Sequence, residues 1–126
     1  MAIKRRLKYW WPTLIWAGII FWFSARPTAT TSEIYLADFV IKKTAHFGEY
    51  AIMVILLFRS LKHTLRWDKQ SLLVLALAVT ILYAISDEFH QSFVPGREPH
   101  LRDIMIDAVG AGVALWLVNK QKLISI

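Results

Sequence analysis

The sequence contains no cysteine, and this absence excludes several kinds of chemistry at once. Without thiols the chain cannot form disulfides, build thiolate metal sites or use a thiol nucleophile. The sequence also lacks a Gly-rich phosphate-binding loop, a dinucleotide-binding fingerprint and the Gly-x-Ser-x-Gly turn of serine hydrolases. Any chemistry must therefore use imidazoles, carboxylates or hydroxyls.

Acidic residues are scarce, with nine Asp and Glu against fifteen Lys and Arg and a net charge of +6. Hydrophobic residues make up 56% of the 126 residues, and the mean hydropathy is +0.44. This is more than the core of a soluble domain of that length requires, so we interpret residues 1–126 as one integral membrane domain. The basic residues flank apolar runs, as they do at membrane boundaries, and we expect no nucleic-acid partner.

Four segments have the length and apolar character expected of membrane-spanning helices: Tyr9–Ser24, Ala45–Leu61, Ser71–Phe93 and Asp103–Val118. The predicted fold class is all-α, a four-helix transmembrane bundle. Pro12 is expected in the first turn of the first helix, where a missing N–H does no harm. The pattern between the first and second helices favours a short interfacial helix around Ile34, Leu36, Phe39 and Val40. The fourth helix has a small-residue surface for close packing, formed by Gly110, Ala111, Gly112 and Ala114.

The distribution of charge predicts the orientation of these helices. Lys and Arg in short loops are retained on the cytoplasmic side of a membrane. With the N-terminus inside, ten of the fifteen basic residues fall on that side: Lys4, Arg5, Arg6, Lys8, Arg59, Lys62, Arg66, Lys69, Lys120 and Lys122. Asp68 is the one acidic residue that accompanies them. We therefore expect both termini in the cytoplasm.

In that orientation three polar clusters meet near the outer face. They comprise His46 and Glu49 in the second helix, Asp87, Glu88, His90 and Gln91 at the end of the third, and Asp103 and Asp107 at the start of the fourth. A charged side chain near the bilayer centre costs about 2.5–3.5 kcal/mol on insertion scales, so ionisable groups inside a membrane indicate a functional site. We interpret these residues as one site in the outer leaflet.

The spacing of these residues suits more than one role. His46 and Glu49 are three residues apart, and Asp87 and His90 repeat that spacing, so each pair shares one helix face. Carboxylate-x-x-His pairs on facing helices can form a metal site, which predicts a divalent ion such as Zn, Mn or Fe. The same groups could instead transfer protons without a metal, or pair with each other to specify helix packing.

Three ordered motifs give the chain a resemblance to a known family. They are Lys43-Thr44-Ala45-His46-Phe47-Gly48-Glu49-Tyr50, Asp87-Glu88-Phe89-His90-Gln91-Ser92-Phe93-Val94-Pro95-Gly96-Arg97, and the stretch from Asp103 to Gly110. Over residues 42–112 the chain resembles the VanZ-like family of small bacterial membrane proteins. The resemblance implies a multi-pass protein of the bacterial cytoplasmic membrane, and the family's namesake is associated with resistance to the lipoglycopeptide teicoplanin. It implies no established reaction.

The family motifs match at twelve positions: His46, Glu49, Tyr50, Asp87, Glu88, His90, Gln91, Pro95, Gly96, Arg97, Asp103 and Gly110. The chain departs from the family pattern at His100, where a small polar residue is usual, and at Asp107, where Asn is common. The carboxylate at position 107 adds negative charge, which could change metal preference or proton affinity.

The first functional hypothesis is an outer-leaflet site that binds and chemically modifies an anionic or glycosylated lipid by hydrolysis or transfer. The predicted catalytic residues are His46, Glu49, Asp87, Glu88, His90, Asp103 and Asp107. Substrate binding is assigned to Lys43, Tyr50, Gln91 and Arg97, and the planar guanidinium of Arg97 suits phosphate or carboxylate oxygens. The ligands of a divalent metal would be His46, Glu49, Asp87 and His90.

Two other functions fit the same sequence. One is a non-enzymatic envelope protein that binds a lipid or a lipoglycopeptide and so contributes to antibiotic resistance. The other is a proton or metal conduit, which is the weaker hypothesis because Ile52–Phe58 and Leu72–Leu82 offer almost no polar relay across the inner half. Four short helices enclose little volume, so a homodimer is a further expectation.

Overall fold

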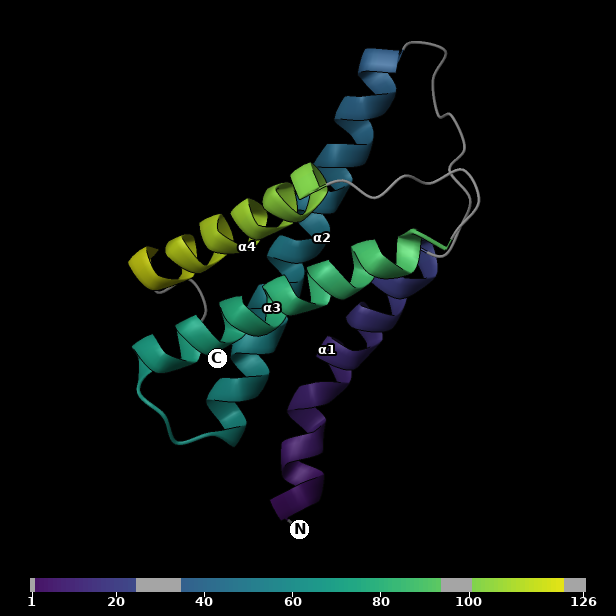
Figure 1. The fold of residues 1–126 in the computed structure, drawn as a ribbon. Helices are drawn as coiled ribbons and strands as arrows, with labels where there is room; N and C mark the ends of the chain where they lie inside the picture. Colours follow the sequence, from purple (N-terminus) through teal and green to yellow (C-terminus); the bar gives the residue numbers. More distant parts are fainter. Residues whose placement is uncertain (1, 25–34, 94–100, 122–126) are drawn as a thin grey trace.

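The computed structural model describes residues 2–24, 35–93 and 101–121 (Figure 1). These residues form four helices: α1 (Ala2–Ser24), α2 (Tyr35–Thr64), α3 (Lys69–Gln91) and α4 (Leu101–Gln121). The described ranges contain no strand, which confirms the all-α fold class. The end of α1, the start of α2, the end of α3 and the start of α4 lie toward the same end of the molecule (Figure 1).

Pro12 lies in the interior of α1, so its predicted place in the first turn is wrong, because the helix begins at Ala2. A proline inside a helix lacks the N–H that would bond a carbonyl one turn earlier. In the turn before Pro12, the carbonyl oxygen of Tyr9 accepts a hydrogen bond from the Ser60 hydroxyl of α2 at 2.7 Å. This hydrogen bond joins α1 to α2 beside the carbonyl of Lys8, the one that loses its intrahelical partner to Pro12.

α2 is the longest helix, with 30 residues, and it runs without a break from Tyr35. The predicted separate interfacial helix is therefore wrong, since residues 35–40 form the first turns of α2; Ile34 lies outside the described residues. The physical reason is that residues 35–44 contain neither Pro nor Gly, and so nothing interrupts the helix before the apolar stretch.

α3 is the one described helix whose length and hydropathy are those typical of a membrane span. The Asp68 carboxylate caps its N-terminus by accepting from the Ser71 backbone N–H at 3.1 Å. The other helices contain charged or aromatic residues within their apolar stretches, which lowers their mean hydropathy. Four helices are thus confirmed, while four membrane spans remain a prediction.

α2 lies at the centre of the arrangement. It contacts α1, α3 and α4, whereas the described parts of α1 and α4 do not contact each other. The larger apolar core joins α2, α3 and α4 and includes Val54, Leu57, Phe58, Leu73, Ala76, Ala111 and Leu115. A smaller cluster joins α1, α2 and α3 through Ile20, Tyr50, Met53 and Ala84.

α2 and α4 approach closely at Gly110, where an added Cβ would lie 2.7 Å from the carbonyl oxygen of Phe47. The predicted small-residue surface is confirmed at this position and at Ala111 and Ala114, which are buried. Gly112 is different, because a Cβ there would meet no atom within 4 Å. The close contact at Gly110 holds the first turns of α4 against α2, where the polar residues gather.

Candidate functional site

Two side chains of α2 contact carboxylates of α4. Lys43 forms an ion pair with Asp103. One turn further along α2, Nδ1 of His46 lies 3.2 Å from Oδ1 of Asp107. The polar residues of α2 and α4, which are about sixty positions apart in the chain, thus come together as the sequence predicts.

A third side chain of α2 contacts α3. The Tyr50 hydroxyl donates to Oδ2 of Asp87 at 3.0 Å, and Nε2 of Gln91 lies 3.4 Å from the same oxygen. Tyr50 is fully buried, and Asp87 and Gln91 of α3 are each less than 5% exposed. We use the name polar layer for the seven residues of these contacts: Lys43, His46, Tyr50, Asp87, Gln91, Asp103 and Asp107.

The helical spacing explains how α2 makes all of these contacts. Lys43, His46 and Tyr50 follow each other at intervals of three and four residues, which places them on one helix face. The seven-residue distance from the first to the last corresponds to roughly 10 Å along the axis. Asp103 and Asp107 are four residues apart and share a face of α4. α2 therefore supplies hydrogen-bond donors, and its neighbours supply carboxylates.

The carboxylates of the polar layer are buried, with exposed fractions of 1% for Asp107, 4% for Asp87 and 6% for Asp103. Oδ1 of Asp87 and Oδ2 of Asp107 have no hydrogen-bond partner in the described part of the chain. A buried polar atom without a partner costs on the order of 1–3 kcal/mol. Such atoms are the ones that a bound proton, ion or polar ligand would satisfy.

α1 also reaches the site, which sequence reasoning missed. The indole Nε1 of Trp16 donates to the backbone carbonyl of Glu49 at 2.9 Å. The ring of Phe21 stacks on His90 with 4.3 Å between ring centroids. Nδ1 of His90 is buried and has no hydrogen-bond partner among the described residues. A signal in the sequence is the aromatic content of the first helix, which includes Trp16 and Phe21.

His46 and Asp87 each form a hydrogen bond with a residue of another helix. His46 bonds Asp107 of α4, and Asp87 bonds Tyr50 of α2. Side chains three residues apart on a helix project side by side toward the neighbouring helix, so each meets a partner there. Tyr50, predicted to bind substrate, therefore holds a catalytic candidate in place.

The remaining predicted residues are distributed as follows. Glu88 is buried, with 3% exposed, and Glu49 is half-buried on α2. Arg97 lies outside the described residues, as do three other positions of the same segment: Pro95, Gly96 and His100. The predicted anion clamp thus stays a prediction.

The predicted metal site was compared with the ligand geometry. Within residues 2–24, 35–93 and 101–121, no three His, Asp or Glu side chains form a group that could hold a metal ion. The predicted ligands, His46, Glu49, Asp87 and His90, are thus not gathered into such a group among these residues. We base no chemical step on a metal, and metal binding stays a prediction.

The His46–Asp107 contact has the geometry required for acid–base chemistry. When Asp107 is ionised its carboxylate can only accept, and Nδ1 of His46 is then the donor in this pair. The other ring nitrogen, Nε2, is then the basic one, and the carboxylate fixes the orientation of the ring. With 16% of its side chain exposed, His46 remains accessible to a ligand, whereas Asp107 is not.

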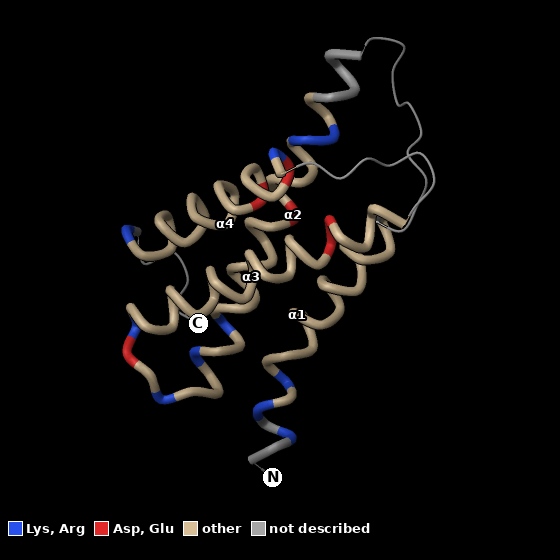
Figure 2. Tube along the Cα trace, viewed as in Figure 1, with Lys and Arg blue, Asp and Glu red and all other residues tan. Residues whose placement is uncertain are grey.

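Charge divides the molecule into two ends. Figure 2 shows the acidic residues of α2, α3 and α4 gathered where these helices meet, away from the basic N-terminal part of α1. The end of α2 is basic as well, with Arg59 and Lys62. The polar layer therefore lies at the acidic end.

A family model described as VanZ/LLP1 matches residues 7–124 of the chain. Comparison with curated proteins and with solved structures finds no match. The family match extends beyond the motif region on both sides and includes most of α1.

Proposed function

Since the chain belongs to the VanZ-like family, we propose that it is a bacterial membrane protein whose polar layer binds and chemically modifies an anionic or glycosylated lipid. The observation that carries the proposal is the pair of buried carboxylates, Asp87 and Asp107, each with one oxygen lacking a partner in the described residues. Such groups are costly to bury and are retained where a protein uses them.

Exposed apolar side chains support a membrane location with several spans. Large hydrophobic residues are more than half exposed on each helix, among them Leu14, Ile15, Val74, Leu82, Val109 and Trp116. Water-exposed apolar surface of this extent is unfavourable, whereas lipid chains cover it at no cost. The basic end fits the cytoplasmic side, so the polar layer would face the outer leaflet in an N-in, C-in arrangement.

The chemistry that the polar layer supports best is phosphoester hydrolysis or transfer by general acid–base catalysis. His46 would accept a proton at Nε2 from water or an alcohol as the oxygen of that nucleophile attacks phosphorus. The bond from phosphorus to the leaving oxygen would break, and the leaving alkoxide would take up a proton from water. Asp107 orients the ring and stabilises its charged form. Lys43, Gln91 and Arg97 would bind the head group, with Arg97 as the bidentate partner.

The test is product formation in liposomes that contain phosphatidylglycerol, cardiolipin and a glycosyl diacylglycerol, analysed by mass spectrometry. Wild-type protein should convert at least one of these lipids. The His46→Ala variant should lose this activity by about 10²-fold or more. His63→Ala is the matched control, because His63 is exposed near the end of α2, where it stacks on Tyr9. Full activity of His46→Ala would refute the proposed role.

Elemental mass spectrometry of the detergent-purified protein tests the metal hypothesis separately. Acid–base chemistry without a metal predicts no stoichiometric Zn, Mn or Fe. About one or two equivalents, lost in both His46→Ala and His90→Ala, would instead identify a metal centre. Arg97→Ala serves as a control, since an arginine guanidinium is not a metal ligand.

The alternative is a non-enzymatic protein that binds a lipid or lipoglycopeptide. The polar contacts favour this candidate, because they join α2 to α3 and α4 as contacts that specify helix packing do. It predicts that no lipid is converted, that lipid binding survives His46→Ala, and that Arg97→Ala weakens binding.

A further inference from the structure

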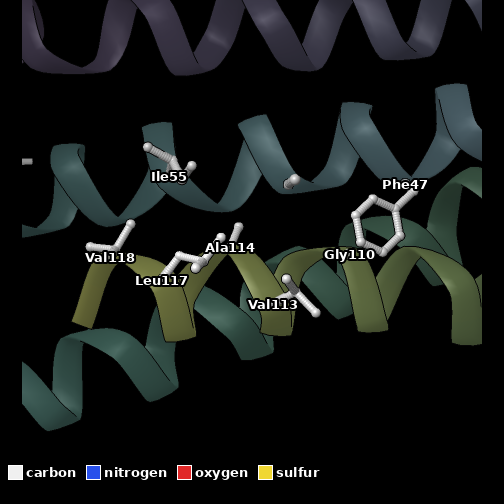
Figure 3. Close-up of a pocket in the computed structure, with 8 residues that line it drawn as sticks. Phe47, Ile55, Gly110, Val113, Ala114, Leu117 and Val118 are labelled. Carbon is white, nitrogen blue, oxygen red and sulfur yellow. The ribbon is translucent and has the colours of Figure 1, made fainter. Parts of the chain in front are cut away.

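An apolar groove lies between α2 and α4 beside the polar layer (Figure 3). Its volume is 320 Å³, and it is lined by Phe47, Ala51, Ile55, Gly110, Val113, Ala114, Leu117 and Val118. Figure 3 shows the Phe47 ring next to Gly110 at one end, and Ile55, Leu117 and Val118 toward the other. The lining contains no charged or polar side chain.

The groove begins where the polar layer ends. Phe47 directly follows His46 on α2, and Gly110 comes three residues after Asp107 on α4. From Phe47 to Ile55 the groove follows α2 for roughly 12 Å, at 1.5 Å per residue. The hydrocarbon core of a bilayer is about 30 Å thick, so this length is close to one leaflet.

The shape of the groove suits a single flexible chain. Ala51 and Ala114 contribute small side chains, while Phe47 and Val113 are 36% and 41% exposed, so the groove is open along one side. At Gly110 the backbones of α2 and α4 are in contact, and the groove closes there. A helix about 10 Å wide could not continue past that contact, whereas an acyl chain could bend over its edge.

We infer that this groove holds the acyl chain of the lipid whose head group contacts the polar layer. The inference rests on the proposed function and specifies it: the ligand is a lipid embedded in the membrane, which enters sideways between α2 and α4. Lys43, which is 19% exposed, lies on the same helix one turn before Phe47, on the head-group side.

Selection of a lipid by this site must come from its head group. Bilayer chains are as apolar as the groove, so a chain by itself gains little on entering. The glycerol hydroxyls of phosphatidylglycerol can donate a hydrogen bond to the exposed edge of His46, whereas the choline of phosphatidylcholine has no hydroxyl to donate. Phosphatidylglycerol should therefore occupy the groove roughly tenfold more than phosphatidylcholine with the same chains.

Photo-crosslinking in phosphatidylcholine nanodiscs tests this inference. Two probes carry a diazirine in the middle of one acyl chain, and differ only in a phosphatidylglycerol or a phosphatidylcholine head group. The phosphatidylglycerol probe should label Leu117 roughly tenfold more than the other, while both label exposed Trp116 equally. Equal labelling of Leu117 by both probes would overturn the inference.

Two matched variants add a second readout. Val113→Trp fills the groove, whereas Val109→Trp places the same bulk one turn earlier on α4, at a 57% exposed position outside the groove. The first should reduce phosphatidylglycerol labelling of Leu117 to the phosphatidylcholine level, and the second should leave it unchanged. If Val113→Trp fails to fold, the wild-type labelling map still decides. Crosslinks of the groove to a second copy of the chain would overturn the inference.

The labelling also separates this inference from the proposed chemistry, because it requires no turnover. Head-group-dependent labelling without product formation would leave the inference standing and contradict catalysis. Product formation without such labelling would support catalysis and contradict the inference.

Discussion

The two ends of α2 bury polar groups in different ways. Near its start, α2 contacts carboxylates of α3 and α4, and Asp87 and Asp107 each keep one oxygen without a partner among the described residues. Near its end, the buried groups are the neutral hydroxyls of Thr13 and Ser60, whose oxygens lie 2.6 Å apart.

Near the end of α2, which we call the hydroxyl end, the buried hydroxyls donate to backbone carbonyl oxygens. Ser60 donates to the carbonyl of Tyr9 at 2.7 Å, and Thr13 donates to the carbonyl of Leu56 at 3.0 Å. Thr80 of α3 likewise donates to Ala76 at 2.8 Å. Hydroxyls that bond helix carbonyls are inexpensive in an apolar core and help helices to pack.

The difference indicates which end serves packing and which end serves ligands. Neutral, fully bonded groups need nothing more from their surroundings. Buried carboxylates with unbonded oxygens carry an electrostatic cost that a proton or a ligand can offset. The following predictions test whether this difference holds.

We expect the strongest change in the rate of lipid conversion. Asp107→Leu should reduce lipid conversion by about 10²-fold or more, because Nδ1 of His46 loses its acceptor. Asp107→Asn keeps an acceptor oxygen but removes the negative charge, so the rate should fall only about tenfold. Rates in the liposome assay check both variants. Equal rates for Asp107→Leu and wild type would show that the His46–Asp107 pair serves helix packing, as the hydroxyls of Thr13 and Ser60 do.

The next effect is steric. Gly110→Ala should destabilise the protein by about 3 kcal/mol, because its Cβ would lie 2.7 Å from the Phe47 carbonyl and the two backbones must separate. Gly112→Ala is the control, since its Cβ meets nothing within 4 Å, and it should stabilise α4 by up to about 1 kcal/mol. Unfolding by SDS titration in detergent micelles measures both. Similar values for the two variants would contradict the close α2–α4 contact.

Removal of single hydroxyls compares the two ends directly. Tyr50→Phe should cost about 2 kcal/mol, because it removes a hydrogen bond to the buried Asp87 carboxylate. Thr13→Val should cost only about 1 kcal/mol, because Ser60 retains its own carbonyl acceptors. The same SDS titration applies to both. A larger cost for Thr13→Val would reverse the proposed difference between the ends.

The smallest effect concerns the exposed cap of α3. The Ser71 hydroxyl and backbone N–H bond the Asp68 carboxylate and hold its pKa below the ordinary value of 3.8. A lowered folded-state pKa stabilises the helix above pH 3.8, and this stability is lost as the pH falls through the folded pKa. Asp68→Ala should therefore lower the melting temperature slightly at pH 7 and not in strong acid.

Asp68→Asn is the control for this cap. Its amide oxygen still accepts at the helix N-terminus, but it does not titrate, so its melting temperature should lack the acid-dependent component. A pH-independent effect of Asp68→Ala would contradict the role of the ionised carboxylate.

Several features could be predicted because they follow from local periodicity and charge. The third and fourth predicted helices, Ser71–Phe93 and Asp103–Val118, differ from α3 and α4 by no more than three residues at each end. His46, Asp87 and Asp107 were assigned to one layer because they lie at the ends of helices that meet there.

The predicted starts of the first two helices were wrong because the residues before them would not interrupt a helix. α2 begins ten residues before the predicted Ala45, since residues 35–44 contain neither Pro nor Gly. α1 includes the basic N-terminal residues, which places Pro12 in its interior. Hydropathy marks the apolar part of a helix and not its charged extensions.

Periodicity and composition are local properties, and they are enough to predict the helical class, the small residues of α4 and the set of polar residues at one end. The contact of His46 with Asp107, the contact of Tyr50 with Asp87 and the groove beside Gly110 become visible only once the helices are packed together. These depend on how each helix is rotated and how closely it approaches its neighbours, and both result from packing across the whole bundle.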